Sequence, residues 1–274
     1  MESAAEDSHS SASAGAMGRS IGGWAHNATD EDCRGLTSRK KSIVYRCAQS
    51  GGVYCLALSG PECCTATMAI VLYHHPHTRA ANVVWMLEEV GVPYQLKYLD
   101  LQTGEHKRPD ILALNPMGKV PILQDDSATV TESAAIGLYL ADRYALGRLA
   151  PSVDDPIRGT YFRWCVYAPS VIEPGAMAKA ANWTFRESNA GFGNYASMIS
   201  CIQSAVAGCK WVLGEQFSMA DVIFGGTLSY MLRFKMIEPL PEFNSYCERL
   251  EQRPARQRAN SINAKVAEER GLGR

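Results

Sequence analysis

Residues 115–136 have the sequence NPMGKVPILQDDSATVTESAAI, and this stretch decides the fold. The apolar residues 120–123 predict a strand, although Pro121 cannot donate to a sheet ladder and should lie at an edge or a bulge. Two aspartates then predict a tight turn into a second strand at 128–131, which should pair antiparallel with the first. A helical pattern begins at Glu132, so the stretch predicts a strand–turn–strand–helix unit.

A strand–helix–strand unit precedes this stretch. Residues 70–73 form a short apolar run, and apolar positions at helical spacing follow Thr78. Residues 94–99 predict a second strand, which is joined to the first by a helical crossover and should be parallel to it. A short helical stretch at 110–114 completes the order βαβαββα, which is typical of an α/β domain.

The helical half of the chain follows this domain, which we place at residues 68–147. A proline and paired aspartates in 148–155 predict a linker. Beyond the linker the pattern is helical throughout. We expect an all-helical domain at 156–262 and a tail at 263–274.

Residues 1–67 differ from the rest of the chain. Their first part is rich in Ser, Ala and Gly without periodicity, so it cannot bury enough apolar area to offset its ordering entropy. Residues 53–58 allow one short strand. We expect a disordered leader, and our hypothesis is that it is an extension upstream of a natural start at Met68.

Charge and composition limit the possible functions. The net charge of the 274 residues is -1, so no basic field indicates nucleic-acid binding. No apolar run reaches about 18 residues, so we expect no membrane span. The nine cysteines are scattered and odd in number, without paired C-x-x-C spacing. They indicate reduced thiols of a cytosolic protein rather than a disulfide framework or a zinc site.

Two features near the strand–turn–strand unit suggest a ligand. If the Val120-Pro121 bond is cis, Val120 can offer its N–H and C=O to an extended, peptide-like ligand. The alternative is an ordinary edge-strand proline. Ser133 and the free N–H groups at the following helix start suit a carboxylate, and Glu132 could pair with the ammonium of the same α-amino acid. The alternative there is a plain helix cap.

A third feature is the segment after the first strand. Thr78 opens a helix, where a hydroxyl and backbone N–H groups can stabilise a thiolate, or it serves only as a cap. His74, His75 and His77 cluster beside it, but alternate strand residues face opposite ways and no carboxylate motif completes a metal site. The position of Tyr73 inside the strand favours packing.

These residues belong to four motifs that together resemble a cytosolic glutathione S-transferase of bacterial or fungal type. The resemblance covers residues 68–262. The motifs lie in the family's order and at its separations, and they are 72–80 with 85–94, 115–123, 131–136, and 217–221. The last of them also predicts a helix start, with Ser218 as N-cap and Asp221 in a capping-box position.

The resemblance implies a thioredoxin-like domain followed by an all-helical domain, with glutathione as co-substrate. It implies a cis proline beside Val120, which would hold the cysteinyl backbone of glutathione, and a γ-glutamyl site at the helix start. It places the glycine carboxylate near His106 and Lys119. The glutathione-binding residues implied in this way are His106, Lys119, Val120, Pro121, Glu132 and Ser133.

The catalytic position departs from the family's usual Tyr, Ser or Cys. Thr78 is our candidate for stabilising the glutathione thiolate, and His77 and Tyr73 are its rivals. The electrophile would lie near Trp164 and two further residues of the helical half, Tyr167 and Met177, although all three are also plausible core residues.

We therefore expect a glutathione transferase whose bound thiolate attacks small electrophiles. The family further implies a cytoplasmic, detoxifying homodimer without metal, nucleic acid or membrane as partners. One alternative is a non-catalytic binding or regulatory module with the same fold. Another is a related glutathione-dependent isomerase, dehalogenase or peroxidase.

Overall fold

The computed structural model describes residues 43–46, 53–56 and 70–273. It divides into two units, residues 1–64 and 65–274. Within the first unit, β1 (Ile43–Arg46) pairs antiparallel with β2 (Val53–Leu56), which lies in the stretch where we expected a short strand. The remaining predictions for the leader concern positions outside the described residues.

The second unit contains a four-stranded sheet with the order β4-β3-β5-β6. Its first two strands, β3 (Ile70–His74) and β4 (Tyr94–Tyr98), are parallel. Two antiparallel strands follow, β5 (Ile122–Asp125) and β6 (Ala128–Thr131). This topology confirms the predicted strand directions.

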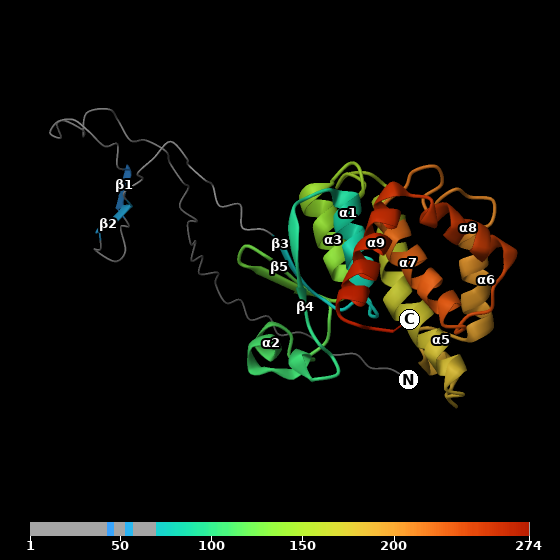
Figure 1. Ribbon diagram of the computed structural model, residues 1–274. Coiled ribbons are helices and arrows are strands. Elements are labelled where there is room, and N and C mark those ends of the chain that lie inside the picture. The colour runs from blue at the N-terminus through green and yellow to red at the C-terminus, as the bar shows by residue number, and fades with distance from the viewer. Residues whose placement is uncertain (1–42, 47–52, 57–69, 274) are drawn as a thin grey trace, which may run out of the picture. The chain divides into compact units, whose positions relative to one another are not determined.

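Helices cover both faces of the sheet because neighbouring strand residues point to opposite sides. Leu72 and Leu123 belong to the main core, which α1 (Ala80–Val90) and α3 (Ser133–Tyr144) share. Figure 1 shows these two helices side by side. The alternate residues Tyr73 and Ile122 belong to a smaller cluster on the other face.

That second cluster packs under a short helical segment. Its remaining fully buried members are Leu99 and Ile111. Ile111 belongs to α2 (Pro109–Leu114), which follows the one-turn 3₁₀-helix η1 (Glu105–Lys107). The sheet therefore separates a large core from a small one.

Every long element after the sheet is helical, as predicted. Their bounds are α4 (Arg158–Tyr167), the π-helical turn η2 (Ala168–Ile172), α5 (Glu173–Ala180), the 3₁₀ turn η3 (Glu187–Asn189), α6 (Tyr195–Val206), α7 (Met219–Arg233), α8 (Pro241–Glu251) and α9 (Pro254–Glu269). None of the described helices is both long and apolar enough to cross a membrane.

The predicted helix start at the beginning of α7 is confirmed. The Ser218 hydroxyl accepts from the Ala220 N–H at 3.2 Å, and the Asp221 carboxylate accepts from the Ser218 N–H at 2.9 Å. Tyr246 donates to the same carboxylate at 2.8 Å. Burial raises the pKa of Asp221 to about 6, although its hydrogen bonds oppose that shift. The cap is therefore part of the helical core rather than a surface feature.

The C-terminal helix joins the helical half to the sheet half. α9 packs along α1, and Arg253, just before α9, forms an ion pair with buried Glu89 at 2.6 Å. α9 continues to Glu269, beyond residue 262, where we expected the helical domain to end in a tail. Within this extension the Asn263 side chain donates to the Ala81 carbonyl at 3.2 Å, which links α9 to α1.

Candidate functional site

Three predicted site segments meet at one end of the sheet. In the strand register Tyr73 pairs with Ile122, and Ile122 pairs with Thr131. The loop after β3, the segment that enters β5 and the segment that leaves β6 therefore lie next to one another. These segments carry Thr78, Val120 and Ser133, which are separated by up to 55 positions in sequence but lie at the same end of the sheet.

The Val120-Pro121 peptide bond is cis, as predicted. Pro121 is buried and Val120 is half-buried. The preceding loop is held by Asn115, whose side-chain amide donates to the Lys119 carbonyl at 2.9 Å and accepts from the Met117 N–H at 3.1 Å. The backbone of Val120 precedes the first residue of β5, so its polar groups are presented at the end of the ladder.

The start of α3 presents free backbone donors at the same end of the sheet. The first helical hydrogen bond runs from the Ile136 N–H to the Glu132 carbonyl, and no side chain caps the helix. The N–H groups of the first three helical residues are thus left for a ligand or water. Glu132 has a φ of 65°, an unusual value for a residue with a Cβ, and it is exposed. The arrangement suits a carboxylate.

Thr78 lies at the helix start, but its hydroxyl has partners within the turn. It donates to the His75 carbonyl at 2.8 Å and accepts from the Ala80 N–H at 3.1 Å. Because a hydroxyl has one proton, Thr78 can donate to a thiolate only by releasing the His75 carbonyl. For the Arg79 N–H, no hydrogen-bond partner is found among the described residues. This backbone donor needs no such exchange.

The two rival side chains, Tyr73 and His77, have environments that do not suit binding of the thiolate. The Tyr73 hydroxyl donates to Gln124 at 2.7 Å, and Gln124 pairs with Val71, farther along the strand from the site. His77 is exposed, and its N–H donates to the Nδ1 of His75 at 3.2 Å. Within the described residues, no three metal-ligating side chains come together.

Two buried histidines, His74 and His75, lie where β3 ends and the loop begins. Burial lowers the pKa of His74 to about 4, and its Nε2 lies 2.7 Å from Asn263 Oδ1. His75 stacks on Tyr98 with ring centroids 5.6 Å apart, and desolvation also lowers its pKa. Both rings are therefore neutral near pH 7, and His74 connects the sheet end to α9.

His106 lies against the loop that enters β5. A Cβ on Gly118 would approach the His106 carbonyl to 3.0 Å, and Gly118 has a φ of 56°, so glycine suits this contact. The adjacent Lys107 donates to the Met117 carbonyl at 2.9 Å. His106 Nδ1 is buried and has no partner among the described residues, whereas Lys119 is exposed. Both residues predicted for the glycine carboxylate thus lie at the loop that enters β5: His106 approaches Gly118, and Lys119 precedes Val120.

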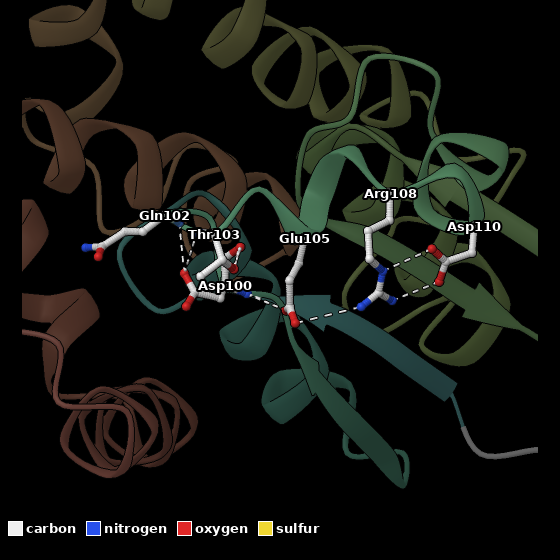
Figure 2. A network of polar contacts seen from close by, with 6 residues as sticks. All are labelled: Asp100, Gln102, Thr103, Glu105, Arg108 and Asp110. Atoms are coloured by element: carbon white, nitrogen blue, oxygen red, sulfur yellow. Dashed lines mark hydrogen bonds and ion pairs between the residues drawn. The ribbon is translucent and has the colours of Figure 1, made fainter.

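A polar network holds the loop that carries His106. Figure 2 shows Glu105 accepting from the Asp100 N–H at 2.8 Å, while Arg108 lies 3.7 Å from Glu105 and 2.8 Å from Asp110. Thr103 and Gln102 donate to Asp100 through their backbone N–H groups. The network fixes η1, and with it the position of His106.

Sequence reasoning missed an ion pair that joins the loop after β3 to the helical half. The Arg79 guanidinium lies 3.2 Å from the Glu173 carboxylate in α5 and 4.2 Å from the centre of the Tyr230 ring in α7. The partners are 94 positions apart or more, and no local pattern indicates their pairing. Arg79 therefore lies between the helices and the loop after β3, residues 75–79, which we call the thiol loop.

The three residues predicted for the electrophile have different environments. Trp164 lies in the core, where its ring meets Tyr167 and Phe224 at 5.3 Å each. Tyr167 is half-buried. Met177 is 43% exposed and lies one helical turn beyond Glu173, on the same face of α5. Of the three, Met177 is the most exposed, and it lies one turn from the residue that pairs with Arg79.

Comparisons with known proteins agree with this geometry. Residues 68–142 match the model of the glutathione S-transferase N-terminal domain. Glutathione S-transferase 3 of Schizosaccharomyces pombe is 33% identical over 171 residues, which are 56% of this chain and 70% of that protein. Glutathione S-transferase 3 of Zea mays is 46% identical over a shorter stretch of 64 residues, 23% of this chain and 29% of the relative.

Solved structures extend the likeness to both halves of the second unit. The glutathione transferase URE2P6 of Phanerochaete chrysosporium, in complex with oxidized glutathione, has a TM-score of 0.61 at 26% identity and covers 72% of this chain and 97% of its own. A glutathione transferase of Methylococcus capsulatus has a TM-score of 0.60 at 27% identity, over 72% and 99%. The chain belongs to the glutathione S-transferase family.

Proposed function

We propose that this protein is a glutathione transferase that stabilises the glutathione thiolate for attack on small electrophiles. The observation that carries the proposal is the convergence of Val120, Ser133 and Thr78 at one end of the sheet. Family membership supports it, because the relatives are glutathione transferases.

In this proposal glutathione lies in an extended conformation across the end of the sheet where β3, β5 and β6 meet. Val120 exchanges backbone hydrogen bonds with the cysteinyl residue, as strand addition does. Ser133 and the N–H groups of α3 bind the γ-glutamyl carboxylate, and Glu132 pairs with its ammonium. His106 and Lys119 bind the glycine carboxylate at the opposite end of the tripeptide.

The chemistry then takes place over the loop after β3. A free thiol has a pKa of about 8.5, and donors at a helix start lower it. The Arg79 N–H, with the Thr78 hydroxyl, stabilises the thiolate. The sulfur forms a bond to the electrophilic carbon. In substitution the leaving group departs with its electron pair, and in addition to an activated alkene the π bond breaks and the neighbouring carbon takes up a proton. The rate gain comes from thiolate population and positioning, without a protein nucleophile.

The second substrate would lie where the loop faces α5, beside Met177 and the Arg79–Glu173 pair. We further propose a cytoplasmic homodimer with a detoxifying role, as the family resemblance implies. Analytical ultracentrifugation of the full chain tests the dimer independently of activity.

Retention on glutathione-agarose and a panel of electrophiles test the function. We expect specific elution by free glutathione and conjugation of at least one aryl halide or activated alkene. Ser133→Ala should lose retention, whereas Ser127→Ala, at an exposed position in the β5–β6 turn, should keep it. Retention without any conjugation would favour the non-catalytic module, and no retention would contradict the proposed site.

A further inference from the structure

A recess lies away from the end of the sheet that carries the proposed glutathione site. It has a volume of about 550 Å³ and lies between the C-terminal end of α6 and one side of α8. Figure 1 shows these two helices on the side of the helical half that faces away from the sheet. Its size is within the range of small-molecule sites, and it shares no residue with the proposed glutathione site.

Two cations and one carboxylate line this recess. The Arg249 guanidinium donates to the Ser245 hydroxyl at 3.0 Å and to the Cys209 carbonyl at 3.2 Å, which fixes its position. Its Nε is buried without a partner among the described residues, and Lys210 beside it is exposed. Neither cation forms an ion pair within the described part of the chain. Glu242 is the acidic residue of the lining.

A thiol lies in the same lining. Cys209 is exposed, whereas the other cysteines of residues 70–273 are buried or half-buried. Burial raises the pKa of the Cys247 thiol to about 11 and that of Cys165 higher still, so these two are protonated near pH 7. Cys209 is therefore the most accessible thiol of residues 70–273; its carbonyl accepts from Arg249, and Lys210 follows it in the chain.

The lining complements one particular kind of ligand. Glutathione carries two carboxylates, one ammonium and one sulfur, and the recess offers two cations, one carboxylate and one thiol. We propose that this recess binds a glutathionyl group and that Cys209 is a site of S-glutathionylation. Lys210 and Arg249 pair with the two carboxylates, and Glu242 pairs with the ammonium.

The reaction is a thiol–disulfide exchange with glutathione disulfide as the oxidant. The Cys209 thiolate attacks one sulfur of the disulfide, a bond forms between that sulfur and Cys209 Sγ, and the original S–S bond breaks. The second glutathione leaves as a thiolate and takes up a proton, which balances the proton lost by Cys209. The proposal shares its ligand with the proposed function but uses none of that site's residues.

The test compares two disulfides on the full chain, with peptide mass spectrometry resolving residue 209. We expect glutathione disulfide to modify Cys209 faster than the neutral 2-hydroxyethyl disulfide. Lys210→Gln and Arg249→Gln should each slow the glutathione reaction on the order of tenfold, the effect of one charge-assisted contact. The rate with the neutral disulfide should fall less, because it depends on these cations only through the thiolate population of Cys209.

Controls separate recognition from simple exposure. Lys265→Gln removes an exposed cation elsewhere and should change nothing, and Cys209→Ser should keep the conjugation rate of the parent. Equal rates with both disulfides, or an unchanged rate of reaction with glutathione disulfide in Lys210→Gln, would overturn the proposal. Lys210 is exposed, so Lys210→Gln remains a valid test even in the case that Arg249→Gln does not fold. A modified Cys209 in a protein without transferase activity would support this inference while contradicting the proposed function.

Discussion

The two sides of the proposed site are built in different ways. On the glutathione side, backbone groups of Val120 and the first turn of α3 are fixed by the strand register. On the helical side, side chains meet across long sequence separations, as in the Arg79–Glu173 pair. Backbone groups keep their positions when side chains change, whereas a side-chain surface is remade by each substitution. We therefore expect the glutathione side to determine binding and the helical side to determine which electrophile reacts.

The largest effect tests whether Trp164 belongs to the helical surface or to the core. Its side chain is 5% exposed and packs against Phe224, so Trp164→Ala should lower the free energy of unfolding by about 3–5 kcal/mol. Denaturant unfolding measures this loss. Met177→Ala, at an exposed position of α5, is the matched variant and should change the electrophile KM with little loss of stability. The opposite assignment holds if Trp164→Ala keeps its stability and alters the electrophile KM.

The next effect concerns the connection between the two sides. The pKa of His74 is lowered to about 4 in the fold and is about 6.5 when unfolded, so the unfolded chain binds the proton first as pH falls. The stability that neutral His74 contributes is therefore complete above pH 6.5 and is lost between pH 6.5 and 4, by at most about 3 kcal/mol.

Unfolding curves at several pH values check this prediction. His74→Gln removes the titrating ring while keeping a polar group for Asn263, and it should flatten the pH dependence in that interval. His77→Gln, at an exposed position, is the control. An equally steep pH dependence in His74→Gln would assign the effect to other groups.

A third prediction concerns the glutathione side alone. Ser133→Ala removes a hydroxyl from the carboxylate site, and the loss of one charge-assisted hydrogen bond should weaken glutathione binding by about 1.5–3 kcal/mol. Calorimetry measures the Kd, with Ser127→Ala as control. The electrophile KM at saturating glutathione should stay close to that of the parent. Unchanged glutathione affinity would remove Ser133 from the site.

How far the sequence predicts each side follows from the same difference. The strand directions and the cap of α7 were predicted from short sequence patterns, and the cis Val120-Pro121 bond was implied by the family resemblance. The pairing of β5 with β3, which makes β5 an inner strand, was not predicted, because Leu72 and Leu123 are 51 positions apart. The Asn263 contacts and the Arg79 pair depend on packing between helices that are distant in sequence. The predicted end of the helical domain at residue 262 was therefore too early, and no role was predicted for Arg79. The role of Thr78 was inferred from its position at a helix start. That position did not reveal that the Thr78 hydroxyl donates its proton to the His75 carbonyl.

The assignment of Thr78 can be tested against its backbone rival. Thr78→Val removes the hydroxyl but leaves the Arg79 N–H, so kcat/KM should fall on the order of 10–100-fold and the apparent pKa of bound glutathione should rise. Thiolate absorbance against pH measures that pKa, and Thr78→Ser should restore the parent value. Tyr73→Phe and His77→Ala are the comparisons. If Thr78→Val titrates like the parent, the backbone N–H suffices and Thr78 is only a cap.

The smallest effect concerns the ion pair between the two sides. The side chains of Arg79 and Glu173 are 36% and 30% exposed, so the pair should contribute only about 0.2–1 kcal/mol to stability. Glu173→Gln keeps the shape of α5 and leaves Arg79 over the Tyr230 ring, but it frees the guanidinium. A freed guanidinium next to the thiol loop should favour electrophiles that carry a carboxylate, lowering their KM severalfold relative to neutral ones. Steady-state kinetics with a matched pair of charged and neutral substrates measures this, and the glutathione KM should not change. If the KM values of both substrates change by the same factor, the Arg79–Glu173 pair fixes the position of the loop and does not select the electrophile. The helical side would then not determine electrophile selectivity at this ion pair.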